Sequence, residues 1–337
     1  YMNFESAEWY DIKNYLDLYQ HIKKHITNHH KKYILLDEVQ NVEQWEKAVN
    51  SLLVDYNSDI YITGSNAYLL SSELPTLLAG RVLTIKIYPF SFKEFIQVYP
   101  FMNHEDKYEQ FDLYLKYGGM PMIVNMNNNE QLITNYLNDL KEVVLQKDLM
   151  NRNNIKDVVF LDNLIKYIAS VIGNLTTPHA IAEYMKKNGS PISNETVDSY
   201  LKMLENAYFI YRMPRYELKR KQLLKTQGKY YFIDNGLKNI IDGISSYDSG
   251  SSYENLIYIE LLRRGYEVYV GQYNDIEIDF IAIKPNEKVY IQVSRSIMDE
   301  KVEEREKRSL LAIHDNYKKI ILTIDRVKNK QIEGIEV

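Results

Sequence analysis

A short apolar strand that ends in two adjacent carboxylates constrains this chain more than any other feature. The segment reads Tyr33-Ile34-Leu35-Leu36-Asp37-Glu38-Val39-Gln40. Its apolar residues favour a strand buried in a parallel sheet, and acids that follow such a strand lie where ligands bind. Asp37 suits Mg²⁺ held through its water shell, and Glu38 suits activation of a water molecule. The alternative is a buried strand that simply ends in solvated acids.

A second strand-like segment, Ile60-Tyr61-Ile62-Thr63-Gly64-Ser65-Asn66, follows after a stretch long enough for a helical crossover. Because the carboxyl ends of parallel strands meet at one edge, we expect both acids to lie beside Ser65 and Asn66. Acids in this position are typical of the Walker B motif of nucleoside triphosphatases. The phosphate-binding motif G-x-x-x-x-G-K-[ST] occurs nowhere in the 337 residues.

Several further motifs follow in a fixed order. They are Met2-Asn3-Phe4-Glu5, Leu35-Leu36-Asp37-Glu38-Val39-Gln40, Thr63-Gly64-Ser65-Asn66, Gly80-Arg81, Pro89-Phe90-Ser91-Phe92-Lys93-Glu94-Phe95, Gly118-Gly119-Met120-Pro121 and Asp234-Asn235-Gly236-Leu237. In these motifs the chain resembles prokaryotic AAA-superfamily ATPases that carry a C-terminal, restriction-endonuclease-like domain of unknown function. In that family a strand, the P-loop and its helix precede the segment that matches Tyr1–Phe4. The resemblance therefore implies that these elements lie upstream of Tyr1.

The resemblance implies an α/β fold with four parts, and a chain of this length exceeds what one core usually supports. Residues 1–90 would form a truncated P-loop NTPase core of the AAA type, with a parallel sheet but without the P-loop. Residues 91–156 would form a helical lid-like extension, and residues 157–235 a winged helix. Residues 236–337 would form an α/β domain like that of PD-(D/E)xK nucleases. Apolar alternation also predicts a strand over 82–88.

The resemblance also implies ATP and Mg²⁺ as cofactors of the intact protein, with hydrolysis rearranging the winged-helix and nuclease-like parts. Asp37 would position Mg²⁺, Glu38 would polarise the attacking water, and Ser65 or Asn66 would sense the γ-phosphate. Arg81 would act as an arginine finger across the interface of a homo-oligomer. A structural salt bridge is the alternative for Arg81. Without a P-loop, residues 1–337 are expected to lack ATPase activity, and no cofactor is firmly expected.

Helical periodicity over about 157–206, followed by two strand-like segments, is typical of a winged helix. The two strands and their loop hold a basic cluster that could contact DNA phosphates: Arg212, Arg215, Lys219, Arg220, Lys221, Lys225 and Lys229. The third helix, however, carries Glu195, Asp198 and Glu205, which oppose approach to a polyanion. A DNA-binding wing and a solvated hairpin between domains therefore both remain open.

The last hundred residues alternate strands and helices in the order of a PD-(D/E)xK nuclease. Asp279 and the helical Glu254 match two acids of such a site, which would hold Mg²⁺. The acid-x-Lys triplet, however, reads Gln292-Val293-Ser294. Glutamine is a poorer ligand for a hard cation than a carboxylate, and serine cannot replace the charge of lysine. The sequence therefore favours a degraded nuclease fold over an active Mg²⁺-dependent nuclease.

Composition excludes several classes of protein. The chain has no cysteine, which rules out disulfides and thiolate catalysis. A formal net charge of −5 gives no overall attraction to nucleic acid, so DNA binding would need a local patch. No apolar run is long enough to span a membrane and no signal peptide opens the sequence, so we predict a cytoplasmic protein without membrane contact.

Overall fold

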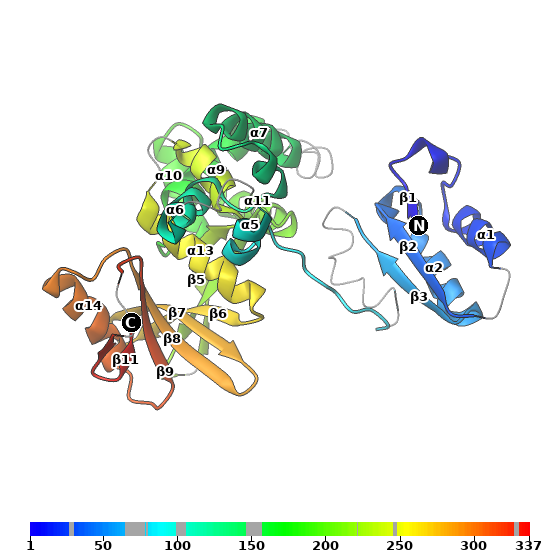
Figure 1. Cartoon of the computed structure of the whole chain (residues 1–337). Coiled ribbons are helices and arrows are strands. Elements are labelled where there is room, and N and C mark those ends of the chain that lie inside the picture. The colour runs from blue at the N-terminus through cyan, green and yellow to red at the C-terminus, as the bar shows by residue number, and fades with distance from the viewer. Residues whose placement is uncertain are drawn as a thin grey trace. The chain divides into compact units, whose positions relative to one another are not determined.

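The computed structural model describes residues 1–26, 30–64, 78, 80–98, 106–145, 157–220, 222–244, 248–326 and 330–337. The chain divides into two compact units, Tyr1–Lys86 and Ile87–Val337. The first holds a parallel three-stranded sheet, and the second holds a mixed eight-stranded sheet (Figure 1). The predicted α/β fold is therefore confirmed. No helix among the residues described is both long enough and apolar enough to cross a bilayer.

The sheet of the first unit has the strand order β1-β2-β3, with all pairs parallel. Its strands are β1 (Met2–Asn3), β2 (Lys32–Asp37) and β3 (Ser58–Ile62). Asn3 pairs with Asp37, and Leu36 pairs with Ile62, so the three carboxyl ends meet at one edge. This register places the acids after β2 beside the residues that follow β1 and β3.

Two helices, α1 (Tyr15–His25) and α2 (Trp45–Asp55), cover one face of this sheet (Figure 1). Asn14 caps α1 by accepting hydrogen bonds from the backbone N–H groups of Leu16 and Asp17. The helices bury apolar residues at helical spacing, and Leu18 and Leu52 are fully enclosed against Leu36 of β2. This core fixes the strand that carries Asp37. Among its described residues, the first unit also contains the short 3₁₀ helices η1 (Ala7–Trp9) and η2 (Val39–Asn41).

The predicted strand over 82–88 is wrong, because residues 81–90 contain no strand. The side chains of Leu83, Ile85 and Ile87 are 71–87% exposed. Alternating apolar residues form a strand only when a neighbouring strand supplies hydrogen bonds. Among the residues described, no strand pairs with this segment.

The second unit begins with a helical layer and ends with the sheet. Its helices are α5 (Phe92–Val98), α6 (Lys107–Tyr117), η4 (Pro121–Asn125), α7 (Glu130–Val143), α9 (Val158–Ser170), α10 (Pro178–Lys187), α11 (Asn194–Asn206), α12 (Asn235–Asp242), α13 (Ser249–Arg263) and α14 (Glu300–Leu311). Its strands are β4 (Ile210–Glu217), β5 (Gln222–Phe232), β6 (Glu267–Tyr273), β7 (Ile276–Lys284), β8 (Glu287–Ser294), β9 (Lys318–Thr323), β10 (Gln331–Ile332) and β11 (Ile335–Glu336).

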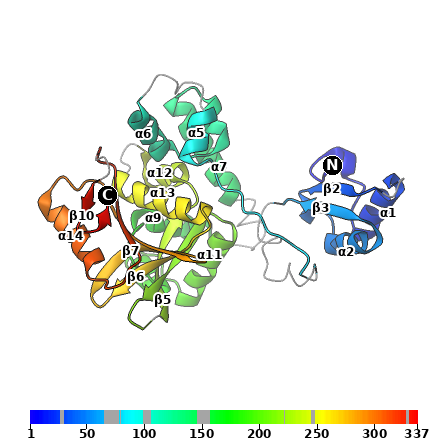
Figure 2. The ribbon, with the colours of Figure 1, turned by 60° about the horizontal axis from the view of Figure 1, so that its bottom comes forward.

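The eight strands follow the order β10-β11-β9-β8-β7-β6-β4-β5. The hairpin β4–β5, where we predicted the wing, joins this sheet through a parallel pairing of Arg215 with Val270 on β6. Helices α12 and α13 lie between α6 and the strands (Figure 2). One apolar core runs from Phe95 on α5 to Ile291 on β8. The predicted domain limit at 235 falls within this continuous core, the limit at 156 lies outside the described residues, and both stay predictions.

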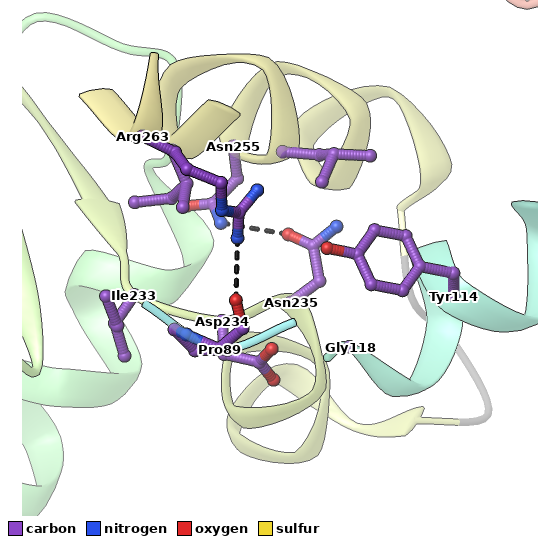
Figure 3. A pocket seen from close by; sticks show the side chains of 10 residues that line it. Pro89, Tyr114, Gly118, Ile233, Asp234, Asn235, Asn255 and Arg263 are labelled. Atoms are coloured by element: carbon purple, nitrogen blue, oxygen red, sulfur yellow. Dashed lines mark hydrogen bonds between the residues drawn. The ribbon is translucent and has the colours of Figure 1, made fainter. Parts of the chain in front are cut away.

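A buried polar network joins the helical layer to α12 and α13 (Figure 3). Both carboxylate oxygens of Asp234 accept backbone hydrogen bonds, one from Gly119 at 2.7 Å and the other from Gly236 at 2.8 Å. Arg263 donates to the carbonyl oxygen of Pro89 at 2.8 Å, and Asn255 donates to Asn235 at 2.9 Å. Burial raises the pKa of Asp234 to about 6, although the backbone N–H groups counter this effect. These contacts explain why the Gly118-Gly119 and Asp234-Asn235-Gly236 motifs belong together.

Candidate active site

Asp37 ends β2 with both carboxylate oxygens engaged by neighbouring donors. Thr63, which follows β3, donates its hydroxyl to Oδ1. Tyr1 donates its hydroxyl to Oδ2 at 2.7 Å, and the Asn3 amide donates to the same oxygen at 3.1 Å. The hydrogen bonds from Thr63 and then Tyr1 lower the pKa of Asp37, so the carboxylate stays ionised near neutral pH. An ionised, rigidly oriented carboxylate suits a cation held through water.

Glu38 follows in a backbone conformation that non-glycine residues seldom adopt. Its φ is 54° and its ψ is 44°, in the left-handed region. Such a conformation costs about 1–3 kcal/mol and is common at functional sites. The backbone N–H of Val39 donates to the carbonyl oxygen of Thr63 at 3.2 Å, which anchors the turn to β3. The Gln40 side-chain amide donates a hydrogen bond to Glu38 Oε2.

The residues present fit one half of a magnesium–nucleotide site. Two acids at the end of a central strand can hold the water shell of Mg²⁺ and polarise a water molecule. The phosphates of a nucleotide require a loop of free backbone N–H groups and a lysine, and the sequence of residues 1–337 lacks that motif. Of the partners of Asp37, Thr63 belongs to the motif Thr63-Gly64-Ser65-Asn66 found in the sequence, whereas contacts from Tyr1 and Asn3 were not predicted.

The structure describes only some of the other residues predicted for this site. Ser65 and Asn66 lie outside the described residues, so their predicted role stays a prediction. Arg81 is exposed, and within the described part of the chain no carboxylate forms an ion pair with it. The structural salt bridge considered for Arg81 therefore finds no partner there.

A second cluster of charges lies in the second unit and centres on Lys229 of β5. Its Nζ atom lies 3.2 Å from Glu254 Oε1 on α13 and 2.9 Å from Glu277 Oε1 on β7. Asp279 Oδ1, also on β7, lies 3.9 Å away. Only 2% of the Lys229 side chain is exposed. We predicted Lys229 as part of the wing's basic surface, and this was wrong because three carboxylates draw the ammonium into the interior.

The residues predicted for a degraded nuclease site divide between this cluster and structural roles. Glu254 and Asp279 both lie beside Lys229. The side-chain amide of Gln292 instead links the backbone of Asp279 to the side chain of Glu306. Its oxygen accepts from the backbone N–H of Asp279 at 2.7 Å, and its nitrogen donates to Glu306 Oε2 at 3.0 Å. Ser294 donates its hydroxyl to the carbonyl oxygen of Ser296. Among the described residues, no group of three or more acids or histidines is arranged to hold a metal ion.

Charge is unbalanced in the Lys229 cluster, since one ammonium faces Glu254, Glu277 and Asp279. Burial alone would lower the pKa of Lys229, but these carboxylates raise it. Burial and then the negative charge of Glu254 raise the pKa of Asp279 to about 7, against the opposing effect of Lys229. Glu306 adds further negative charge from α14.

The raised pKa of Asp279 makes the stability of the second unit depend on pH. An acid whose folded pKa exceeds its unfolded value stabilises the fold below the unfolded pKa, near 3.8, and loses this effect as pH rises through about 7. We therefore expect the urea midpoint of the second unit to fall between pH 5 and pH 8. Asp279→Asn, which keeps the side-chain shape, should flatten this fall. An unchanged slope in Asp279→Asn would show that other groups set it.

The predicted DNA-contacting cations do not form one open surface. Arg212 and Arg215 on β4 are half-buried, and Arg215 donates to the Gln227 side chain. Lys219 and Arg220 are exposed in the turn, where Lys219 lies 5.3 Å from the ring centroid of Tyr273. Lys221 and the side chain of Lys225 lie outside the described part. DNA binding through this hairpin therefore stays a prediction.

Comparison with known proteins assigns the chain to a family. The family described as an AAA domain matches residues 1–96, and a domain of unknown function, DUF8612, matches residues 108–248. An uncharacterized protein of Haemophilus influenzae is 41% identical over 339 residues, which span 100% of this chain and 84% of that protein. The chain belongs to the family of this protein. The match to an AAA domain covers the first unit, and Asp37 and Glu38 lie inside the matched range.

The family extends to archaea. The uncharacterized protein MJ1544 of Methanocaldococcus jannaschii is 30% identical over 354 residues, which span 100% of this chain and 77% of that protein. Among solved structures, protein VC1899 from Vibrio cholerae covers 90% of this chain with 11% identity and a TM-score of 0.18. That TM-score is too low to indicate a shared fold.

Proposed function

We propose that this AAA-family chain supplies the metal-binding and water-activating acids of an ATPase. The observation that supports it is the position of Asp37, with Glu38 directly after it, at the carboxyl edge of a parallel sheet, in a segment that matches an AAA domain. ATP would supply the electrophilic phosphoryl group, and Mg²⁺ would neutralise part of its negative charge. Asp37 would orient water ligands of Mg²⁺, and Glu38 would accept a hydrogen bond from the attacking water.

The environment of each acid supports this division of roles. The hydrogen bonds from Thr63 and Tyr1 keep Asp37 ionised and fixed, as an acid that faces a cation requires. Glu38 follows Asp37 directly, in the left-handed backbone conformation that leads into η2. Thr63 contacts Asp37 directly and anchors the Glu38 turn through its backbone, which links β3 to both acids. Arg81 would complete the site as a finger in a homo-oligomer, because its guanidinium is exposed.

The metal role of Asp37 predicts how nucleotide binding depends on magnesium. The test uses a version of the chain that carries a phosphate-binding loop upstream, and a fluorescent ATP analogue. Mg²⁺ should tighten binding by about tenfold or more in the parent, and Asp37→Asn should reduce this effect to about twofold. Affinity measured in EDTA should change little. If the Asp37→Asn variant keeps the full magnesium effect, Asp37 has no role in binding the metal.

The wider task of ATP hydrolysis is also part of the proposal. Hydrolysis would rearrange the winged-helix and nuclease-like parts of the second unit. The order of α9, α10 and α11 before the β4–β5 hairpin supports a winged-helix interpretation. We do not extend the proposal to cleavage of DNA, because the buried ammonium of Lys229 stands among the acids that would otherwise face a metal.

A further inference from the structure

An open cleft of about 490 Å³ lies in the first unit beside the end of β2. The loop after β1, the 3₁₀ helix η1 and the end of η2 form its walls. Its lining residues are Phe4, Glu5, Trp9, Tyr10, Ile12, Lys13 and Asn41. Three of these seven residues are aromatic, which is a large share for a cleft that water can enter. The ATPase proposal gives no role to any of them.

The aromatic rings of this cleft are suited to cations. The Tyr10 side chain is 56% exposed, and the Nζ atom of Lys13 lies 5.5 Å from its ring centroid. The Tyr10 ring therefore already accepts an ammonium group from within the chain. Trp9 is held in place by an edge-to-face contact with His21, whose ring centroid lies 5.2 Å away. A fixed indole and an exposed phenol are the rings on which ammonium and guanidinium groups bind best.

Charge around the cleft favours the same class of ligand. The loop from Phe4 to Lys13 holds three acids, Glu5, Glu8 and Asp11, against the single cation Lys13. All three acids are exposed. A net negative loop repels phosphates and attracts cationic groups. Phe4 and Ile12, which also line the cleft, are buried and belong to the core of the first unit.

The cleft is connected by hydrogen bonds to the acid that ends β2. The backbone N–H of Glu5 donates to Asn3 Oδ1 at 2.9 Å, and Asn3 Nδ2 donates to Asp37 Oδ2 at 3.1 Å. The backbone N–H of Phe4 donates to the carbonyl oxygen of Asp37 at 3.0 Å. On the opposite wall, Asn41 ends the 3₁₀ helix that begins directly after Glu38. A ligand in the cleft thus contacts two segments that hold the candidate catalytic acids.

We propose that this cleft binds an arginine or lysine side chain of an extended polypeptide segment. The cationic group lies against the Trp9 and Tyr10 rings, and the carboxylate of Glu5 supplies the opposite charge. This binding is independent of the proposed ATPase activity, because it uses none of the nucleotide-site residues. A nucleic acid is the competing ligand, since bases also stack on aromatic rings.

The test titrates the whole chain with the capped peptide Leu-Arg-Leu-Arg and, as a matched control, Leu-Glu-Leu-Glu. Calorimetry measures affinity, and tryptophan emission locates the site. The chain has two tryptophans, and Trp45 is only 4% exposed, so a peptide in the cleft changes mainly the emission of Trp9. We expect saturable binding of the arginine peptide that is at least about tenfold tighter than that of the glutamate peptide.

Two variants place the binding in the cleft. Trp9→Ala should weaken binding of the arginine peptide by about tenfold. Glu5→Gln, a surface change that keeps the fold, should weaken it by about threefold to fivefold. Asp139→Asn, an exposed acid on α7, should have no effect. The proposal is overturned if neither peptide binds, if both bind equally, or if Glu5→Gln leaves affinity unchanged. Displacement of the arginine peptide by oligo-dT would overturn it in favour of a nucleic acid.

Discussion

Replacing Glu38 by glutamine is expected to lower ATP turnover by about 10²–10⁴-fold in a version of the chain that carries a phosphate-binding loop. Glutamine keeps the size and the hydrogen-bonding reach of the side chain but cannot accept a proton or polarise water as a carboxylate does. Nucleotide affinity should stay within about threefold, because Glu38 acts on the water and not on the phosphates. Steady-state hydrolysis and equilibrium binding measure the two effects separately.

The matched control is Glu46→Gln, an acid on α2 in the same unit but outside the strand end. It should change neither turnover nor affinity by more than about twofold. A second control is Glu38→Asp, which keeps the charge at this left-handed position but shortens the side chain. Glu38→Asp should retain more activity than Glu38→Gln. Equal turnover in the parent and Glu38→Gln would mean that another group activates the water.

Replacing Lys229 by methionine is expected to lower the free energy of unfolding of the second unit by about 3–5 kcal/mol. Methionine fills most of the lysine volume but leaves Glu254, Glu277 and Asp279 close together without a cation. Burying unpaired charge costs more than the lost hydrogen bonds alone. Both tryptophans lie in the first unit. Far-UV circular dichroism should therefore report the loss, while tryptophan emission reports an unchanged first unit.

Lys202→Met is the matched control, because Lys202 forms an exposed pair with Asp198 one helical turn away. Exposed pairs of this kind contribute about 0.5 kcal/mol or less. Adding Glu277→Gln to Lys229→Met should recover part of the loss, since it removes one of the repelling charges. A Lys229→Met protein as stable as its parent would show that the three acids are neutralised by other means.

The sequence predicted the parallel strands β2 and β3 of the first unit because their signals are local. An apolar run, two acids and a spacing of one crossover are enough to place Asp37 at the edge of a parallel sheet. The hydrogen-bond partners of Asp37 are less accessible, because Tyr1 and Asn3 reach it only through the pairing of β1 with β2. The segment over 82–88 was predicted wrongly for a related reason. Its alternation predicts a strand, but a strand needs a neighbour that the sequence pattern cannot supply.

The second unit departs further from prediction because its key contacts join distant residues. Lys229 reads as one more cation in a basic hairpin, and only the folded arrangement of β5, β7 and α13 shows that it is buried. Asp234 and Gly119 are likewise separated by more than a hundred residues, yet their motifs form one network. Short motifs such as Gly118-Gly119 identify positions where backbone must approach closely, but not which residue approaches.

The most direct test of this account is Mg²⁺-dependent ATP hydrolysis by residues 1–337 alone. The strand-end acids need a phosphate-binding loop, and the sequence of this chain contains none. We predict turnover indistinguishable from background. Turnover that Asp37→Ala abolishes, at a rate equal to that of a version with a phosphate-binding loop, would contradict the account.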